Sequence, residues 1–106
     1  MKLYLDDVRH PSEQYSDSEE WTVVRTAEEA IKILESNVVT EISFDHDLGT
    51  ELTGYDVATR MEELVVTGVI KMPECYIHSA NPVGRQRIHA AIKNMETYAS
   101  LVKQHV

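Results

Sequence analysis

Short β-rich segments alternate with capped helical segments along this chain of 106 residues, and that alternation restricts the fold more than any other feature. Each β-rich segment contains mainly β-branched or aromatic residues and is bounded by polar or turn residues. The predicted strands are residues 2–5, 22–25, 41–44 and 75–78. Because parallel neighbours need a crossover between them, strands that alternate with helices predict a parallel sheet with helices over both of its faces.

Three predicted helices begin at residues that are typical of helix N-caps, and apolar residues at helical spacing follow each of them. Thr26 and Thr53 each precede, by three residues, an acidic residue that can complete a capping box. Asn81 is followed by a proline, which is favoured at the first helical position. These signals place one helix after each of the second, third and fourth strands.

The connection between the first two strands lacks the apolar spacing of a helix. We therefore expect a loop between Asp6 and Trp21, which is still long enough for a parallel crossover. Residues 1–106 are predicted to form a single domain. The predicted fold class is α/β: a trimmed three-layer sandwich with about three main helices and a four-stranded parallel sheet, for which we assume the order 2-1-3-4.

The composition excludes several classes of function. Ten basic residues against eighteen acidic ones give a net charge of −8, which argues against binding along an extended nucleic acid but allows recognition of one phosphate or one RNA end. The single cysteine, Cys75, excludes an internal disulfide framework and a cysteine-rich zinc site. No apolar run approaches the roughly 18 residues of a membrane span and no signal peptide is recognisable, so we expect a soluble, cytoplasmic protein.

Acidic residues follow two strands that the predicted order makes neighbours. Asp6 and Asp7 come directly after the first strand, and Asp45 and Asp47 after the third. Taken singly, each is also typical of a solvated turn. Because ligands of open parallel sheets bind at the carboxyl ends of the strands, we expect Asp6, Asp7 and Asp45 to converge there. Crowded carboxylates need a cation, so they predict a site for Mg²⁺ or Mn²⁺.

Two histidines lie near the same predicted edge. His46 stands between Asp45 and Asp47, and His78 ends the fourth strand. A histidine beside carboxylates can act as an acid, a base or a metal ligand. We predict catalytic roles for His46 and His78, with Asp47 orienting a histidine; a core or outward-pointing position remains the alternative for His46.

The segment HSANPVGRQR, residues 78–87, is the best candidate for binding a phosphate. Backbone N–H groups and the dipole at a helix N-terminus favour an anion, and Gly84 would allow it to approach closely. The predicted phosphate-binding residues are Ser79, Asn81, Arg85 and Arg9, although Arg9 is equally compatible with an ordinary surface position.

The arrangement of Asp6, Asp7, Asp45 and Ser79 resembles the response-regulator receiver domain, which has a flavodoxin-like fold. Receivers carry an acidic pair after the first strand, a phosphoacceptor aspartate after the third, and a serine or threonine after the fourth. The segments LDDVRHP, SFDHDLG and HSANPVG are more similar to a divergent branch, the cyclic-phosphate processing receiver-like family. This resemblance spans nearly the whole chain and implies a role in processing cyclic phosphates or RNA ends.

Two departures from an ordinary receiver bear on the function. His46 and Asp47 follow the position of the phosphoacceptor, where a receiver has no such pair. A fifth strand, with the lysine that helps a receiver to bind its acyl phosphate, is not predicted after the third helix. These departures weigh against two-component signalling and favour a hydrolytic site.

Three functions remain open from the sequence. The first is a metal-assisted phosphoesterase that acts on a phosphate-containing small molecule or an RNA end. The second is a receiver-type phosphoacceptor with Asp45 as its nucleophile. The third is a non-catalytic binding or adaptor module, for which a failure to bind any divalent cation would be evidence.

Overall fold

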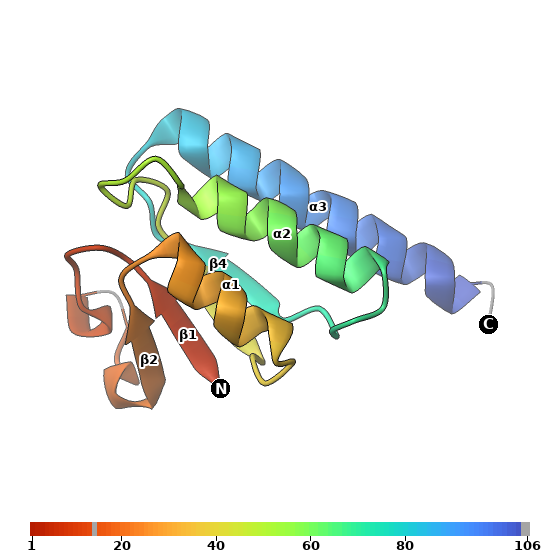
Figure 1. Ribbon diagram of the computed structural model, residues 1–106, viewed down its shortest axis with the longest axis horizontal. Helices are drawn as coiled ribbons and strands as arrows, with labels where there is room; N and C mark the ends of the chain where they lie inside the picture. The colour runs from red at the N-terminus through yellow and green to blue at the C-terminus, as the bar shows by residue number, and fades with distance from the viewer. Residues whose placement is uncertain (14, 105–106) are drawn as a thin grey trace.

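The computed structural model describes residues 1–13 and 15–104, which form a four-stranded parallel sheet and three α-helices (Figure 1). The sheet order is β2-β1-β3-β4, as predicted. Two predicted strands are shifted by one residue, since β2 and β4 each begin and end one position earlier. The strands are β1 (Lys2–Leu5), β2 (Trp21–Val24), β3 (Glu41–Phe44) and β4 (Glu74–Ile77), and the helices are α1 (Ala27–Glu35), α2 (Gly54–Val66) and α3 (Pro82–Gln104).

All three predicted N-caps are confirmed by hydrogen bonds. The hydroxyl of Thr26 accepts from the backbone N–H of Glu29 at 3.3 Å and donates to its carboxylate at 3.0 Å. The backbone N–H of Thr53 donates to the Asp56 carboxylate at 2.7 Å, which forms part of the predicted capping box. The side-chain oxygen of Asn81 accepts from the backbone N–H three residues later at 3.0 Å. These local bonds satisfy N–H groups that a helix start leaves without partners.

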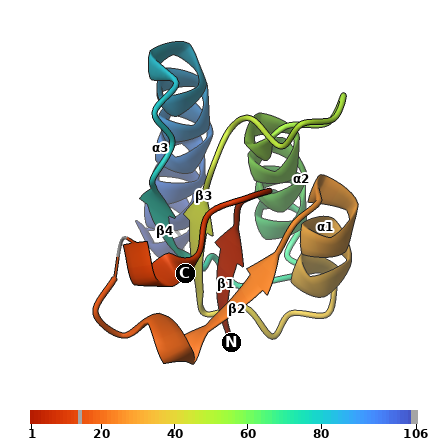
Figure 2. The same cartoon turned by 90° about the vertical axis from the view of Figure 1, so that its left-hand side faces the viewer.

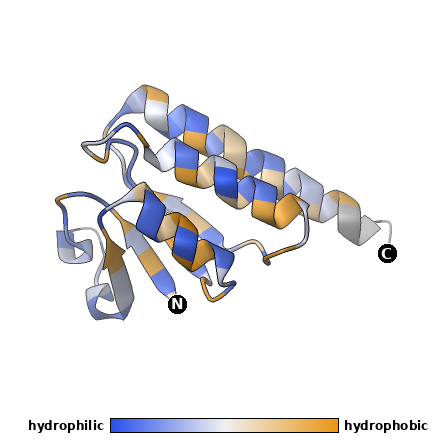
Figure 3. Cartoon of the chain, viewed as in Figure 1, coloured by the Kyte–Doolittle hydropathy of each residue, from blue (hydrophilic) through white to orange (hydrophobic). Residues whose placement is uncertain are grey.

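The three α-helices pack against one face of the sheet, where they form the main hydrophobic core (Figure 2). Alternate strand residues point into this core: Leu3 and Leu5 from β1, and Ile42 and Phe44 from β3, all fully buried. Figure 3 shows apolar and polar residues interleaved along each helix, as expected of helices with one buried face. Of the helices in residues 1–13 and 15–104, none is both long and apolar enough to cross a membrane.

The opposite face of the sheet is covered without an α-helix, which corrects the prediction that helices cover both faces. The β1–β2 connection lies over it and contains two short 3₁₀ turns, η1 (Pro11–Glu13) and η2 (Ser18–Glu20). Aromatic rings fill this layer: Tyr4 packs edge-on against Tyr15 and Trp21, and the latter two rings stack 4.9 Å apart. The expected loop is therefore confirmed, and it supplies the third layer because aromatic side chains can bury this face without helical periodicity.

Candidate functional site

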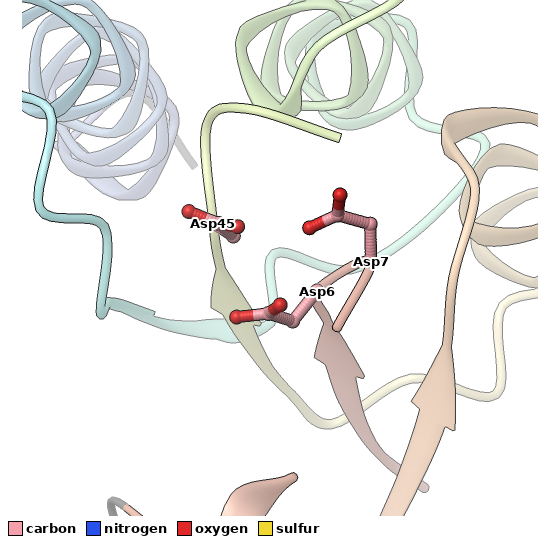
Figure 4. A group of neighbouring side chains, drawn as sticks. All are labelled: Asp6, Asp7 and Asp45. Carbon is pink, nitrogen blue, oxygen red and sulfur yellow. The ribbon is translucent and has the colours of Figure 1, made fainter. Parts of the chain in front are cut away.

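Three carboxylates meet where β1 and β3 end (Figure 4). One oxygen each of Asp6, Asp7 and Asp45 lies within 4.8 Å of the others. Parallel pairing positions them, because Leu5 and Phe44 are register partners and the N–H of Asp45 donates to the carbonyl of Leu5 at 2.9 Å. Asp6 is fully buried and Asp45 is 5% exposed, so two of these charges lie largely out of water. The predicted convergence of the three acids is therefore present in the structure.

The carboxylate of Asp6 is already fully hydrogen-bonded. Its Oδ1 accepts the backbone N–H groups of Val8 at 2.9 Å and Arg9 at 2.8 Å. Its Oδ2 accepts Arg9 Nε at 2.9 Å and His78 Nε2 at 3.0 Å. Burial by itself raises the pKa of Asp6, but these N–H donors and the Arg9 charge hold that pKa below its ordinary value. Asp6 is therefore an ionised carboxylate with its acceptor positions in use.

The free oxygens of the cluster belong to its other two members. Asp45 uses Oδ1 to accept the N–H of His46 at 2.9 Å and Arg9 Nη2 at 3.3 Å, whereas its Oδ2 accepts no hydrogen bond from the described residues. Burial and the nearby charge of Asp6 raise the pKa of Asp45. Asp7 is partly buried, and its carboxylate accepts no hydrogen bond within residues 1–13 and 15–104. Two carboxylates with free oxygens fit Mg²⁺ or Mn²⁺, which take one or two carboxylates and keep waters or phosphate oxygens as further ligands.

Arg9 brings a positive charge into the cluster. Its guanidinium spans Asp6 and Asp45 and also donates from Nη1 to the carbonyl of His78 at 3.3 Å. The side chain is 29% exposed, so one side of it remains open to solvent. The alternative of an unattached surface arginine is therefore wrong. Arg9 offsets part of the carboxylate repulsion and leaves the cluster with an excess of negative charge.

His78 is held in the interior by both of its ring nitrogens. Nε2 contacts Asp6, and Nδ1 lies 2.7 Å from the hydroxyl of Ser43. The imidazole stacks on the ring of Tyr4 at a centroid distance of 4.3 Å, and its side chain is 2% exposed. Burial lowers the pKa of His78, although the Asp6 carboxylate acts in the opposite direction. A phosphate could reach neither nitrogen without displacing Asp6 or Ser43.

His46 differs from His78 in having one ring nitrogen available. Its Nδ1 lies 3.1 Å from Asp47 Oδ1, and no residue of the described chain hydrogen-bonds its Nε2. Asp47 also accepts from Asn81 Nδ2 at 3.2 Å, and these hydrogen bonds from Asn81 and His46 lower the pKa of Asp47. A neutral histidine oriented by a carboxylate can exchange a proton through its second nitrogen. The arrangement suits His46 to the role of a general acid or base.

Gly84 has a different function from the one predicted. A Cβ at this position would lie 2.6 Å from Cδ2 and 2.7 Å from Cβ of His46, so the ring of His46 occupies the space that a side chain would need. The sequence suggested that this glycine lets an anion approach the start of α3. The structure shows that it lets His46 pack there, because the loop after β3 lies against the first turn of α3.

Three predicted phosphate-binding residues, Ser79, Asn81 and Arg85, lie between the end of β4 and the first turn of α3. Ser79 is 3% exposed, and its hydroxyl accepts the backbone N–H of Asn81 at 3.1 Å. Arg85 donates from Nη1 to the carbonyls of Ile77 at 3.1 Å and Ser79 at 3.0 Å. The side chain of Asn81 caps α3 with its oxygen and donates to Asp47 from its Nδ2. Within the described residues, none of the three hydrogen-bonds Asp6, Asp7 or Asp45, and the Nη1 of Arg85 is directed to the end of β4.

Two residues of the site were missed in the sequence. Gly54 is buried where a Cβ would overlap the carbonyl oxygen of Asp45, and its N–H donates to the carbonyl of His46 at 2.8 Å. Ser43 is a fully buried polar residue of β3 that bonds His78. Strand alternation was the available signal for Ser43, because it shares its face with Asp45 two residues later.

A comparison with known protein families agrees with the geometry. The family model described as the cyclic-phosphate processing receiver domain matches residues 1–94. Searches of curated proteins and of solved structures found no match. Receiver domains typically bind Mg²⁺ through acidic residues, and this chain has three such residues together at the end of β1 and β3. The sheet order, the acidic cluster and the extent of the match lead to one conclusion: the chain belongs to the cyclic-phosphate processing receiver domain family.

Proposed function

We propose that this protein is a divalent-cation-dependent phosphoesterase that acts on a cyclic phosphate or on a phosphate at an RNA end. The observation that carries the proposal is that the three carboxylates of the cluster differ in how many of their oxygens are free. Asp6 has its oxygens occupied by N–H donors, whereas Asp7 and Asp45 keep oxygens free for a cation. The family's description, which names cyclic-phosphate processing, supports the same class of substrate.

Mg²⁺ or Mn²⁺ would be held by Asp7 and Asp45. Asp6 would not bind the cation directly but would help to hold Asp45 in place through Arg9, which contacts both carboxylates. A bound cation polarises a phosphoryl oxygen and lowers the pKa of a coordinated water. Arg9, already beside Asp45, can turn the open side of its guanidinium to a phosphate oxygen. Ser79 and Asn81 would contact the same phosphate directly or hold Asp47 and the start of α3 in place beside it.

His46 is the proposed general acid or base of this site. Its free Nε2 can accept a proton from water or donate one to the leaving oxygen, while Asp47 fixes the orientation of the ring through Nδ1. His78 is assigned a different role, because both of its nitrogens are already bonded in the interior.

The test is a screen for turnover with Mg²⁺ and Mn²⁺, using nucleoside 2′,3′- and 3′,5′-cyclic phosphates and oligoribonucleotides with cyclic or terminal phosphates. The wild type should hydrolyse at least one of these classes, and chelation of the cation should stop it. His46→Ala should lose about 10²–10⁴-fold in rate and still bind the cation. His89→Ala is the matched control, because His89 is exposed on α3, and it should retain full activity. No turnover with the cation bound would refute the proposal.

A second candidate is phosphoryl transfer to Asp45, which is favoured by the free Oδ2 of that carboxylate. Incubation with a small acyl phosphate and Mg²⁺, followed by mass spectrometry, tests it directly. A phosphoryl adduct that Asp45→Asn abolishes, without turnover of any phosphate ester, would favour the phosphoacceptor. Absence of both reactions and of cation binding would favour a binding module.

A further inference from the structure

Four side chains from four separate segments form a continuous chain of hydrogen bonds that ends at the carboxylate cluster. The hydroxyl of Tyr15, in the β1–β2 connection, lies 2.7 Å from Ser43 Oγ on β3. Ser43 Oγ lies 2.7 Å from Nδ1 of His78, which follows β4. Nε2 of His78 lies 3.0 Å from Oδ2 of Asp6, which follows β1. A residue of the loop layer is therefore linked to the buried carboxylate through two intermediaries.

The donors along this chain can be assigned from the chemistry of its ends. An ionised Asp6 only accepts, so His78 Nε2 must carry a hydrogen and donate it. The hydroxyl of Tyr15 has no other hydrogen-bond partner among the described residues, so its hydrogen is used when it donates to Ser43. Ser43 then donates to Nδ1 of a neutral His78. In this order, each hydrogen has an acceptor; the reverse order would leave the Tyr15 hydrogen without a protein partner.

Packing holds each member of the chain in place. The imidazole of His78 lies parallel to the ring of Tyr4, with an interplanar angle of 7°. The ring of Tyr15 stacks on Trp21 with an interplanar angle of 15°. Ser43 is fully buried in the central part of the sheet. Neither the imidazole of His78 nor the ring of Tyr15 can turn without losing its stacked contact, so the fold maintains the order of the hydrogen bonds.

We propose that Tyr15 and Ser43 are positioning residues, which act through His78 to hold Oδ2 of Asp6 in one orientation. This inference deepens the proposed function, because Asp6 supports the two carboxylates assigned to the cation. Oδ2 of Asp6 is also the oxygen that accepts Arg9 Nε, so its orientation sets where the guanidinium lies relative to Asp45. Removing a hydrogen-bond partner of a metal ligand typically changes metal affinity by about 10–100-fold. Asp6 supports the ligands and is not one of them, so the effect of removing its support should be smaller.

The test begins with the cation-free protein, using ¹⁵N-labelled histidine and NMR correlations that distinguish the two ring nitrogens. Wild-type His78 should be a single neutral tautomer with its hydrogen on Nε2. Ser43→Ala should leave the hydrogen on Nε2, where Asp6 accepts it, but should change the ¹⁵N chemical shift of Nδ1, because Nδ1 loses its donor. Tyr15→Phe keeps the stacked ring and should produce a smaller change, because the Ser43 hydroxyl becomes free to turn. Tyr76→Phe is the control: its hydroxyl bonds Glu41 and Glu74 at the surface, and His78 should be unaffected.

Calorimetric titration with Mg²⁺ provides the second readout. Ser43→Ala should bind Mg²⁺ more weakly than the wild type by up to about 10-fold, Tyr15→Phe should lie between them, and Tyr76→Phe should equal the wild type. A wild-type His78 that carries its hydrogen on Nδ1, or that is unchanged in both Ser43→Ala and Tyr15→Phe, would overturn the inference. A wild type that shows the predicted tautomer but hydrolyses no phosphate would instead refute the proposed function alone, so the two failures are distinct.

Discussion

Replacing Gly84 by alanine tests whether His46 lies against the first turn of α3, on which its assignment as an acid or base depends. The new Cβ would lie 2.6 Å from Cδ2 and 2.7 Å from Cβ of His46, far inside the ordinary contact distance of about 3.5–4.0 Å between carbon atoms. Because one of these atoms is at the base of the side chain, rotation of the ring cannot remove the overlap. Either the loop after β3 moves or His46 leaves its contact with Asp47.

The sign of the effect distinguishes this geometry from an open helix surface. In an open helix, Gly→Ala stabilises the fold by up to about 1 kcal/mol. Overpacking at a buried contact costs about 1–3 kcal/mol, so we expect Gly84→Ala to lower the free energy of unfolding. Each kcal/mol corresponds to roughly 4–8 °C in the Tm of a domain of about 100 residues, which thermal or urea denaturation measures readily.

A double-mutant cycle isolates the contact from the helix propensity. His46→Gly removes the Cβ and ring atoms that the new methyl group would meet, so Gly84→Ala in this background should be neutral or stabilising. The expected coupling energy is therefore about 1–3 kcal/mol. If Gly84→Ala changes Tm by the same amount in both backgrounds, or stabilises the otherwise wild-type protein, the position of His46 is wrong.

Three further predictions concern the cluster and the start of α3. Burial and the charge of Asp6 raise the pKa of Asp45, so cation-free stability should fall as pH rises from the ordinary carboxyl range through that raised pKa. Asp45→Asn should melt above the wild type at neutral pH, and this difference should vanish in acid; an Asp45→Asn protein that melts lower at neutral pH would contradict it. Mg²⁺ at a hundredfold excess over Kd should stabilise the wild type by about 2.7 kcal/mol and should have little effect on Asp7→Asn, as followed by Tm. Asn81→Ala should cost about 1 kcal/mol in denaturation experiments through the lost cap, whereas Asn94→Ala, at an exposed position of the same helix, should not.

The sequence predicted those parts of the fold that depend on local chemistry. Thr26, Thr53 and Asn81 could be assigned as caps because a cap bonds residues three positions away, and the structure confirms each of them. Alternation of strands and helices predicted a parallel sheet but does not by itself fix the strand order. The structure confirms the assumed order 2-1-3-4, which places the acids after β1 and β3 side by side. The one-residue shifts of β2 and β4 have little consequence, since strand ends are weakly marked in sequence.

The covering of the sheet could not be deduced in the same way. Strands that alternate with helices along the chain predict a sheet with both faces buried. This pattern does not say whether a helix or a loop covers each face. The β1–β2 connection has no helical period, yet its Tyr15, together with Trp21 at the start of β2, packs against Tyr4 on this face. A few aromatic rings can replace a helix because each buries a large apolar area.

The sequence by itself located the strand ends to within one residue, and therefore predicted which carboxylates and histidines gather at one edge of the sheet. Only the tertiary structure decided which of their atoms are free. Asp6 and His78 are 72 positions apart, and their hydrogen bond, like the contact of Gly84 with His46, depends on how whole elements pack. Residue spacing reports the periodicity of one segment, whereas the partners of a buried nitrogen or oxygen depend on the distances between segments. For this reason the sequence favoured a functional role for His78 over one for His46, although the fold leaves one ring nitrogen of His46 free and occupies both nitrogens of His78.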